Sequence, residues 1–245
     1  MPGKDQKTSE IRAFCFDVFG TLVDWREGIA REARVFLARL GRPDIDPYDF
    51  ADAWRDRYQP AMAACREDRR PYTKLDVLHR ENMVEVFTVF DIDPARVPQH
   101  EQDWLNFAWH RLDPWPDVVE GLQRLKSRYI IAPASNGNIA LMVNLAKRSG
   151  LPWDAILGAD VSRHYKPRPE SYLALAEVLG LAPSEVCMTA AHNYDLAAAR
   201  DCGLSTAFVP RPMEFGDPRR ADIQPAQKWD FIATDLIDLA RQAGC

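Results

Sequence analysis

The sequence predicts an α/β fold in which a doubly wound parallel sheet is interrupted, after its first strand, by a long helical insert. A short apolar segment near residue 13 and several more beyond residue 129 alternate with helical patterns, as in parallel sheets. Between about residues 25 and 112 only helical patterns occur. At 245 residues the chain is long enough for a core and an insertion. We expect a core domain of residues 1–23 and 113–245 and a helical domain of residues 24–112.

The first expected strand ends at a carboxylate. The apolar run Ala13–Phe16 stops at Asp17, and the chain then turns through Gly20 and Thr21. In open α/β sheets the carboxyl ends of the strands form the ligand-binding edge, because the loops there surround a small molecule. A single aspartate at a strand end often only caps a turn, so the significance of Asp17 depends on the residues at the ends of the other strands.

The insert reads as a helical bundle. Asp24 can cap a first helix, which Gly41 ends, and helical patterns continue at about residues 47–65, 73–90 and 94–112. Its tryptophan, phenylalanine and leucine residues recur at helical spacing, which is typical of a bundle core rather than a cofactor site.

The remainder of the core resumes the α/β alternation. We expect strands at residues 129–132, 155–159, 186–190, 206–209 and 231–232, and helices at 139–149, 170–179 and 194–202. A glycine comes after each of these helices, where a left-handed residue commonly ends a helix.

Composition excludes several classes of function. The net charge of −5 gives no basic excess for binding nucleic acid or an anionic membrane. Five scattered cysteines without a C-x-x-C pair do not predict a disulfide framework or a zinc cluster. Residues 1–10 are polar and expected to be disordered, and no apolar stretch reaches the roughly 20 residues that span a membrane. We expect a soluble, cytoplasmic protein.

Polar side chains come after the later strands as well. Ser135-Asn136-Gly137 comes after the second expected strand, Lys166 lies in a loop after the third, and His192, Asn193 and Asp195 come after the fourth. Each group alone is common in turns or on surfaces. Together with Asp17, four successive strand ends with such groups predict one site.

This order of residues resembles the haloacid dehalogenase superfamily, whose four motifs match Asp17, Ser135, Lys166 and Asp195. The resemblance covers nearly the whole chain, and the insert lies where that superfamily carries a cap. It implies a Rossmann-like core, a helical-bundle cap and a hydrolase with Asp17 as nucleophile.

Most members of this superfamily are magnesium-dependent phosphatases, and two positions depart from their pattern. Phe19 stands where phosphatases have a second aspartate, which is a general acid and a backbone metal ligand. Ala191 stands where they have an acidic metal ligand. Because Mg²⁺ requires several oxygen ligands, we expect weak or no metal binding and no cofactor.

The segments D-V-F-G-T-L-V-D-W, S-N-G, Y-K-P and H-N-Y-D-L resemble the metal-independent (S)-2-haloacid dehalogenase branch. That resemblance implies that Asp17 attacks the halogen-bearing carbon of a 2-haloalkanoate and forms an ester. Water then hydrolyses the ester to a 2-hydroxy acid of inverted configuration, and halide is released.

The same resemblance assigns the remaining site residues. Thr21 and Lys166 would hold Asp17, Asp195 would pair with Lys166 and position water, and Ser135 would bind the substrate carboxylate. Asn136 and Arg55 would stabilise the halide or the substrate anion, although Arg55 could be an ordinary surface arginine. Phe19 and Tyr172 would complete the substrate pocket, although Tyr172 could be a core tyrosine.

His192 marks a departure from the branch, which has Ser-x-Asn where this chain has Ala190-Ala191-His192. His192 could position the water, act as the general base, or be a structural histidine beside Asn193. We include both His192 and Asn193 among the predicted catalytic residues, with Asp17, Thr21, Lys166 and Asp195.

Two other functions remain open: a phosphatase acting on a small phosphorylated metabolite, and a non-catalytic protein of the same fold. Against the second, the chain retains five charged and polar residues that a pure scaffold does not need: Asp17, Thr21, Ser135, Lys166 and Asp195. Fold analogy also predicts a homodimer.

Overall fold

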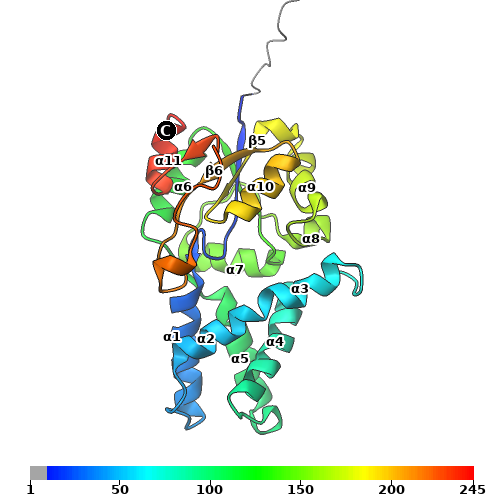
Figure 1. Ribbon diagram of the computed structural model, residues 1–245, viewed down its shortest axis with the longest axis vertical. Helices are drawn as coiled ribbons and strands as arrows, with labels where there is room; N and C mark the ends of the chain where they lie inside the picture. Colours follow the sequence, from blue (N-terminus) through cyan, green and yellow to red (C-terminus); the bar gives the residue numbers. More distant parts are fainter. Residues whose placement is uncertain (1–9) are drawn as a thin grey trace, which may run out of the picture.

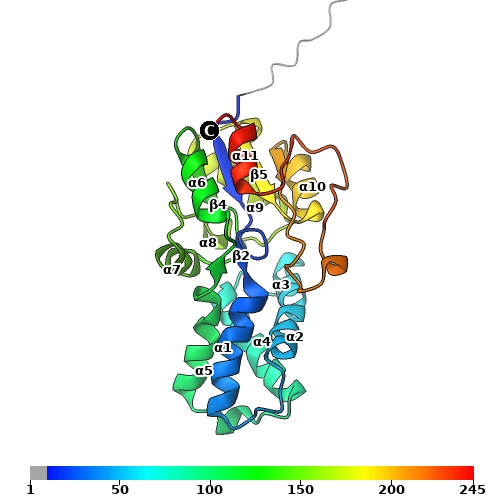
Figure 2. The same ribbon diagram turned by 90° about the vertical axis from the view of Figure 1, so that its left-hand side faces the viewer.

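The computed structural model describes residues 10–245, so most of the segment predicted to be disordered lies outside the described residues. The molecule is elongated, with a sheet-containing half and a helical half stacked end to end (Figure 1). The C-terminus lies at the far end of the sheet-containing half from the helices (Figures 1 and 2). Residues 10–245 contain no helix that is both long and apolar enough to cross a membrane.

Five parallel strands form the sheet, in the order β4-β1-β5-β6-β7. Their bounds are Ala13–Phe16 for β1, Ile130–Pro133 for β4, Val186–Ala190 for β5, Ser205–Phe208 for β6 and Phe231–Ile232 for β7. β1 is an interior strand, between β4 and β5. The ends of these three strands therefore lie side by side, which confirms the sheet predicted from the sequence.

Helices cover both faces of the sheet (Figure 1). The helices of this half are α6 (Val118–Lys126), α7 (Ile139–Ser149), α8 (Ala159–Ser162), α9 (Pro169–Leu179), α10 (Asn193–Asp201) and α11 (Leu236–Gln242), and it also has short 3₁₀ turns η3 (Pro183–Glu185) and η4 (Pro218–Arg220). Phe14 and Phe16 of β1 pack in the core that contains α6 and α11, whereas Ala13 and Cys15 pack with α9 and α10. This alternation places a buried strand between two apolar layers.

One strand prediction was wrong. Residues 155–158 are a loop and Ala159 begins α8, so no strand lies at residues 155–159. The segment packs on the loop after β4 instead: Ala159 N–H donates to the Gly137 carbonyl at 3.0 Å, and a Cβ on Gly158 would lie 2.6 Å from that oxygen. Lys166 consequently comes after α8 rather than after a strand.

The helical half confirms the predicted bundle. Its elements are α1 (Trp25–Arg39), α2 (Pro47–Asp56), α3 (Tyr58–Arg66), α4 (Leu75–Val89), η1 (Pro94–Arg96), α5 (Gln99–Asn106) and η2 (Phe107–His110). Phe36 stacks on Phe87 with 5.4 Å between ring centroids, and Phe50 packs against both. The second predicted helix is divided at Arg57, and the fourth is divided between α5 and the 3₁₀ turns.

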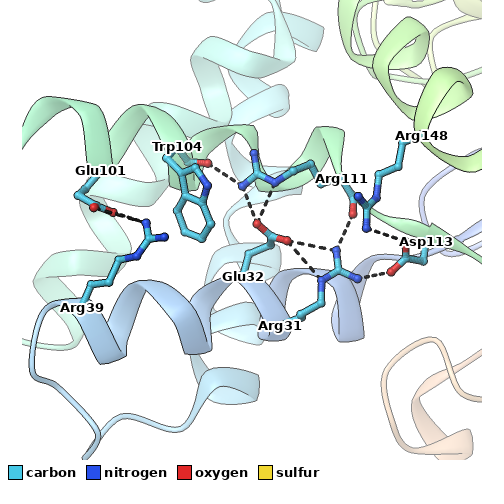
Figure 3. Close-up of polar contacts among 8 residues, drawn as sticks. All are labelled: Arg31, Glu32, Arg39, Glu101, Trp104, Arg111, Asp113 and Arg148. Carbon is cyan, nitrogen blue, oxygen red and sulfur yellow. Dashed lines mark hydrogen bonds and ion pairs between the residues drawn. The ribbon is translucent and has the colours of Figure 1, made fainter.

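The chain crosses between the halves twice, and the two crossings are joined. β2 (Val23–Asp24) pairs antiparallel with β3 (Asp113–Pro114). Figure 3 shows the ion-pair network beside them, in which Arg31 and Arg111 bind Glu32 while Asp113 binds Arg31 and Arg148 of α7. The predicted boundaries at 23/24 and 112/113 lie at this junction, and the division of the chain into two domains there stays a prediction.

Candidate active site

The Asp17 carboxylate is buried directly after β1 and both of its oxygens have partners. Thr21 Oγ1 donates to Oδ2 at 2.7 Å, and Lys166 Nζ donates to Oδ1 at 3.0 Å. The Ala191 N–H donates to Thr21 Oγ1 at 2.9 Å, which orients the hydroxyl. Burial alone would raise the pKa of Asp17, but Lys166 and His192 hold it well below its usual range. Asp17 is therefore a fixed, ionised carboxylate.

Lys166 is shared by two carboxylates. Its Nζ lies 2.5 Å from Asp195 Oδ2 as well as 3.0 Å from Asp17 Oδ1. Burial would lower the pKa of Lys166, but the two carboxylates raise it above its ordinary value. Burial raises the pKa of Asp195 against the opposing effect of Lys166. The predicted Asp195–Lys166 pairing is present in the structure.

Tyr172 binds the Asp195 carboxylate of this pair. Its side chain is fully buried, and its hydroxyl donates to Asp195 Oδ1 at 2.6 Å. The sequence predicts Tyr172 either in the substrate pocket or in the core. The structure shows Tyr172 as a core residue whose hydroxyl binds the carboxylate of Asp195.

The loop after β4 brings Ser135 and Asn136 to the same edge of the sheet. Ser135 Oγ accepts the Gly137 N–H at 3.0 Å, and Asn136 Oδ1 accepts the Lys166 N–H at 2.8 Å. The Asn136 side chain thus joins the loop after β4 to the loop that carries Lys166. Among the described residues the Ser135 hydroxyl has no acceptor, so its proton is available to bind a ligand anion.

The helical half contributes an aromatic and cationic wall. Phe19 makes edge contacts with Tyr58 and Trp109, with ring centroids 6.3 and 5.7 Å apart. The Arg55 guanidinium lies 4.3 Å from the Tyr58 ring centroid, and Arg55 Nη1 is buried without a hydrogen-bond partner among the described residues. A buried N–H donor without a partner is costly unless a ligand satisfies it. Arg55 is thus not an ordinary surface arginine.

His192 lies between two carboxylates. Its Nδ1 is 3.2 Å from Asp17 Oδ2, and its Nε2 is 2.9 Å from Glu214 Oε2. Burial would lower the pKa of His192, but Glu214 and Asp17 outweigh it and raise the pKa to about 10. At neutral pH the imidazole is therefore protonated while Asp17 is an ionised carboxylate.

Glu214 and Arg211 are site residues that the sequence interpretation missed. Both lie in the loop after β6, and both side chains are buried. Arg211 Nε donates to the Thr21 carbonyl at 2.8 Å while its other nitrogens bind Asp117. The available signal was their position, because two charged residues soon after an expected strand fit the pattern that identified the other site residues.

Asn193, a predicted catalytic residue, makes its side-chain hydrogen bonds outside the cluster around Asp17. Its side-chain oxygen accepts N–H groups of Ala226 and Trp229, and its amide donates to the Gln224 carbonyl. These contacts commit the side chain to the segment at residues 224–229. We therefore do not include Asn193 among the residues that act on a substrate.

The donor set does not fit a magnesium ion. Phe19 provides a ring and Ala191 a methyl group and an N–H, while the oxygens of Asp17 face Lys166 Nζ and a protonated His192. Within residues 10–245, three or more His, Cys, Asp or Glu side chains are nowhere grouped as metal ligands. Two protein cations occupy the surroundings in which a divalent ion would need oxygen ligands.

Comparison with known proteins identifies the family of the chain. Residues 11–203 match the model of the haloacid dehalogenase-like hydrolase family. The chain belongs to this family. The family assignment and the predicted sheet with its helical insert are thus confirmed, whereas the roles of individual residues stay predictions.

Similar proteins within the family include dehalogenases and phosphatases. An (S)-2-haloacid dehalogenase 4A from Burkholderia cepacia is 29% identical over 241 residues, which cover 94% of this chain and 98% of the relative. The crystal structure of a defluorinating L-2-haloacid dehalogenase is 49% identical, with a TM-score of 0.94 over 96% of each chain. A phosphoglycolate phosphatase from Chromobacterium violaceum is 28% identical, over 81% of this chain and 85% of that protein.

Proposed function

We propose that this hydrolase is a metal-independent dehalogenase that converts short 2-haloalkanoic acids to 2-hydroxy acids through an ester of Asp17. The observation that carries the proposal is the buried, ionised Asp17 held by Lys166 and Thr21, beside Phe19 where a phosphatase would need an acid. The similarity to (S)-2-haloacid and L-2-haloacid dehalogenases supports it.

In the first half-reaction, one Asp17 oxygen attacks the halogen-bearing carbon from the side opposite the halogen. The new C–O bond forms as the C–X bond breaks, and the halogen leaves with the bonding electrons. This displacement inverts the carbon. Since a halide leaves without a proton, a phenyl ring at Phe19 is compatible with the chemistry.

The substrate anion and the halide need separate partners. Ser135 Oγ and nearby N–H groups are assigned to the substrate carboxylate. Arg55 Nη1, which lacks a partner among the described residues, is assigned to the departing halide together with the Asn136 amide group. A cationic donor at the leaving group stabilises charge that develops in the transition state.

In the second half-reaction, water attacks the carboxyl carbon Cγ of Asp17. The bond between Cγ and the substrate oxygen breaks, which releases the 2-hydroxy acid with its inverted configuration and restores the Asp17 carboxylate. Lys166, held by Asp195, would stabilise the negative charge that develops on the Asp17 oxygen.

The alternative is a phosphatase, which the 28% identity to a phosphoglycolate phosphatase favours. Such an enzyme would transfer a phosphoryl group to Asp17 and would depend on Mg²⁺ for charge stabilisation. Phe19 and Ala191 argue against it.

Halide release from chloroacetate and from each enantiomer of 2-chloropropionate, measured with EDTA present, distinguishes the two. We expect release that prefers the (S) enantiomer, survives EDTA and is lost in Asp17→Asn. A single turnover in oxygen-18 water should place the label in the Asp17 carboxylate. Magnesium-stimulated cleavage of an aryl phosphate, with no halide release, would instead establish the phosphatase.

The expected homodimer and the cytoplasmic location stay predictions. Sedimentation that shows only a 27.9 kDa species would remove the homodimer.

A further inference from the structure

The carboxylate of Glu214 contacts His192, whose other ring nitrogen lies beside Asp17 Oδ2. Its side chain is 2% exposed, and its two oxygens have different partners. Oε2 lies 2.9 Å from His192 Nε2, whereas Oε1 accepts Trp25 Nε1–H at 3.1 Å and lies 3.9 Å from Arg55 Nη2. A buried carboxylate is costly unless it is paired, so these contacts fix both the position and the charge of Glu214.

The turn after Asp17 leaves room for this carboxylate. Gly20 has a φ of +87°, and a Cβ at that position would lie 2.1 Å from Glu214 Oε1. Only glycine permits both the backbone conformation and the approach of Glu214. The turn at Gly20 and the loop after β6 that carries Glu214 are therefore in direct contact.

The other nitrogen of His192 faces the nucleophile. Nδ1 lies 3.2 Å from Asp17 Oδ2, yet it makes no aligned hydrogen bond with any described residue. Because Glu214 binds Nε2, the imidazole is held with Nδ1 beside the carboxyl group that a water must attack. A base at this position can accept a proton from a water molecule that lies between Nδ1 and Cγ of Asp17.

We propose that His192 is the general base of ester hydrolysis and that Glu214 is its positioning residue. The inference rests on the proposed ester of Asp17. Glu214 holds Nε2–H, and Nδ1 removes a proton from the water that attacks Cγ of the alkylated Asp17. The arrangement has the general pattern in which a carboxylate orients a histidine base.

Alkylation itself converts His192 into a base. In the resting enzyme two carboxylates contact the imidazole, which raises the pKa of His192 to about 10. Ester formation removes the negative charge of Asp17 and leaves Glu214, so the pKa falls towards its ordinary value. Arg55 beside Glu214 and Lys166 beside Asp17 act in the same direction, and Tyr194 stacks on the imidazole as a neutral ring.

The protons balance over one turnover. The imidazolium proton leaves to solvent after the halide has left, so the first half-reaction releases a halide and a proton. In the second half-reaction neutral His192 takes one proton from water, and the remaining hydroxide forms a bond to Cγ. The substrate oxygen leaves Cγ and takes the proton of the imidazolium. The hydroxyl proton that remains on the Asp17 carboxyl group then passes to His192, which restores the ionised Asp17 and the protonated histidine.

The first test is His192→Ala with halide release and the mass of the protein both recorded. We expect one equivalent of halide per site, a substrate adduct on the Asp17 peptide, and hydrolysis slowed by about 10²–10⁴-fold. Added imidazole should restore turnover. If His192→Ala does not fold, His192→Phe keeps a planar ring in the same space.

Each other outcome has a definite meaning. A folded His192 variant that turns over at the wild-type rate, or that forms no ester while the wild type does, overturns the proposal. If the wild type itself releases no halide from any haloacid, the proposed function has failed instead.

Glu214→Gln tests the positioning role through the pH profile of ester hydrolysis. Glu214 raises the pKa of His192, so its loss should move the rise of the hydrolysis rate to lower pH and reduce the plateau. A merely structural role would lower stability and leave the midpoint unchanged, which overturns the assignment of Glu214. Glu32→Gln is the matched control, because Glu32 is also a buried glutamate with arginine partners but lies in the helical half (Figure 3).

Discussion

Replacing Lys166 with methionine removes the cation that two buried carboxylates share. Lys166 is 7% exposed and lies 3.0 Å from Asp17 and 2.5 Å from Asp195. Removing one partner of a buried ion pair typically costs about 3–5 kcal/mol, because it leaves the opposite charge buried and unpaired. Asp17 keeps Thr21 and Asp195 keeps Tyr172 as donors. We therefore expect Lys166→Met to lose about 3–5 kcal/mol of unfolding free energy at pH 7.

This loss should depend on pH in a defined direction. In the wild type the depressed pKa of Asp17 contributes stability above the unfolded pKa of about 4, and that contribution is lost only as the pH falls further. In the variant burial raises the pKa of both carboxyl groups, so they take up protons as the pH falls from 7 towards 4. The difference in unfolding free energy should then narrow.

Urea unfolding at pH 7, 5.5 and 4.5 measures this difference. Lys126→Met is the control, because the Lys126–Asp154 pair has a similar length of 2.8 Å but Lys126 is 39% exposed. That exposed pair should contribute about 0–1 kcal/mol at every pH. A Lys166 variant as stable as the wild type at pH 7, or a difference independent of pH, would refute the assignment of Lys166 as the shared cation.

Three further substitutions test neighbouring contacts. Gly20→Ala should destabilise the chain by about 1–3 kcal/mol and slow ester hydrolysis more than halide release, because the new Cβ displaces Glu214; urea unfolding and burst kinetics measure the two effects. Tyr172→Phe should cost about 1–3 kcal/mol by removing the donor to Asp195, with KM for the haloacid unchanged; a raised KM would return the hydroxyl to the substrate pocket. Arg55→Met should weaken inhibition by added chloride, and unchanged inhibition would remove Arg55 from the halide site.

The sequence predicted most of the sheet, and it indicated several residues that the structure brings together around Asp17, because the patterns that mark strands and strand ends are local. Asp17, Ser135 and Asp195 each lie within a few residues of a strand end, and apolar runs mark those strands. The failures have physical reasons. An apolar run at residues 155–159 fits a strand and a packed loop equally well, and the contact with Gly137 that decides between them is not local.

Glu214 was missed for the same reason in a stronger form. It lies 22 residues after His192, in a loop with no motif of its own, and it reaches the site because β6 lies beside β5. No helical or strand period relates the two residues. The contact depends on strand order, which the sequence pattern does not specify, and on the left-handed turn at Gly20.

The charges around Asp17 give a physical argument for the metal independence that we propose. The described site holds three buried carboxylates, Asp17, Asp195 and Glu214, against the cations Lys166, His192 and Arg55. These charges sum to zero while Asp17 is free, so an additional divalent ion would leave an excess of positive charge in a buried site. A haloacid brings one negative charge through its carboxylate, and alkylation removes the charge of Asp17. The sum returns to zero in the ester, although the charge next to His192 Nδ1 has gone. In the mechanism that we propose, His192 therefore loses its proton because the neighbouring charge of Asp17 is gone and not because the net charge has changed. The contact between Nδ1 and Asp17 would then control the second half-reaction.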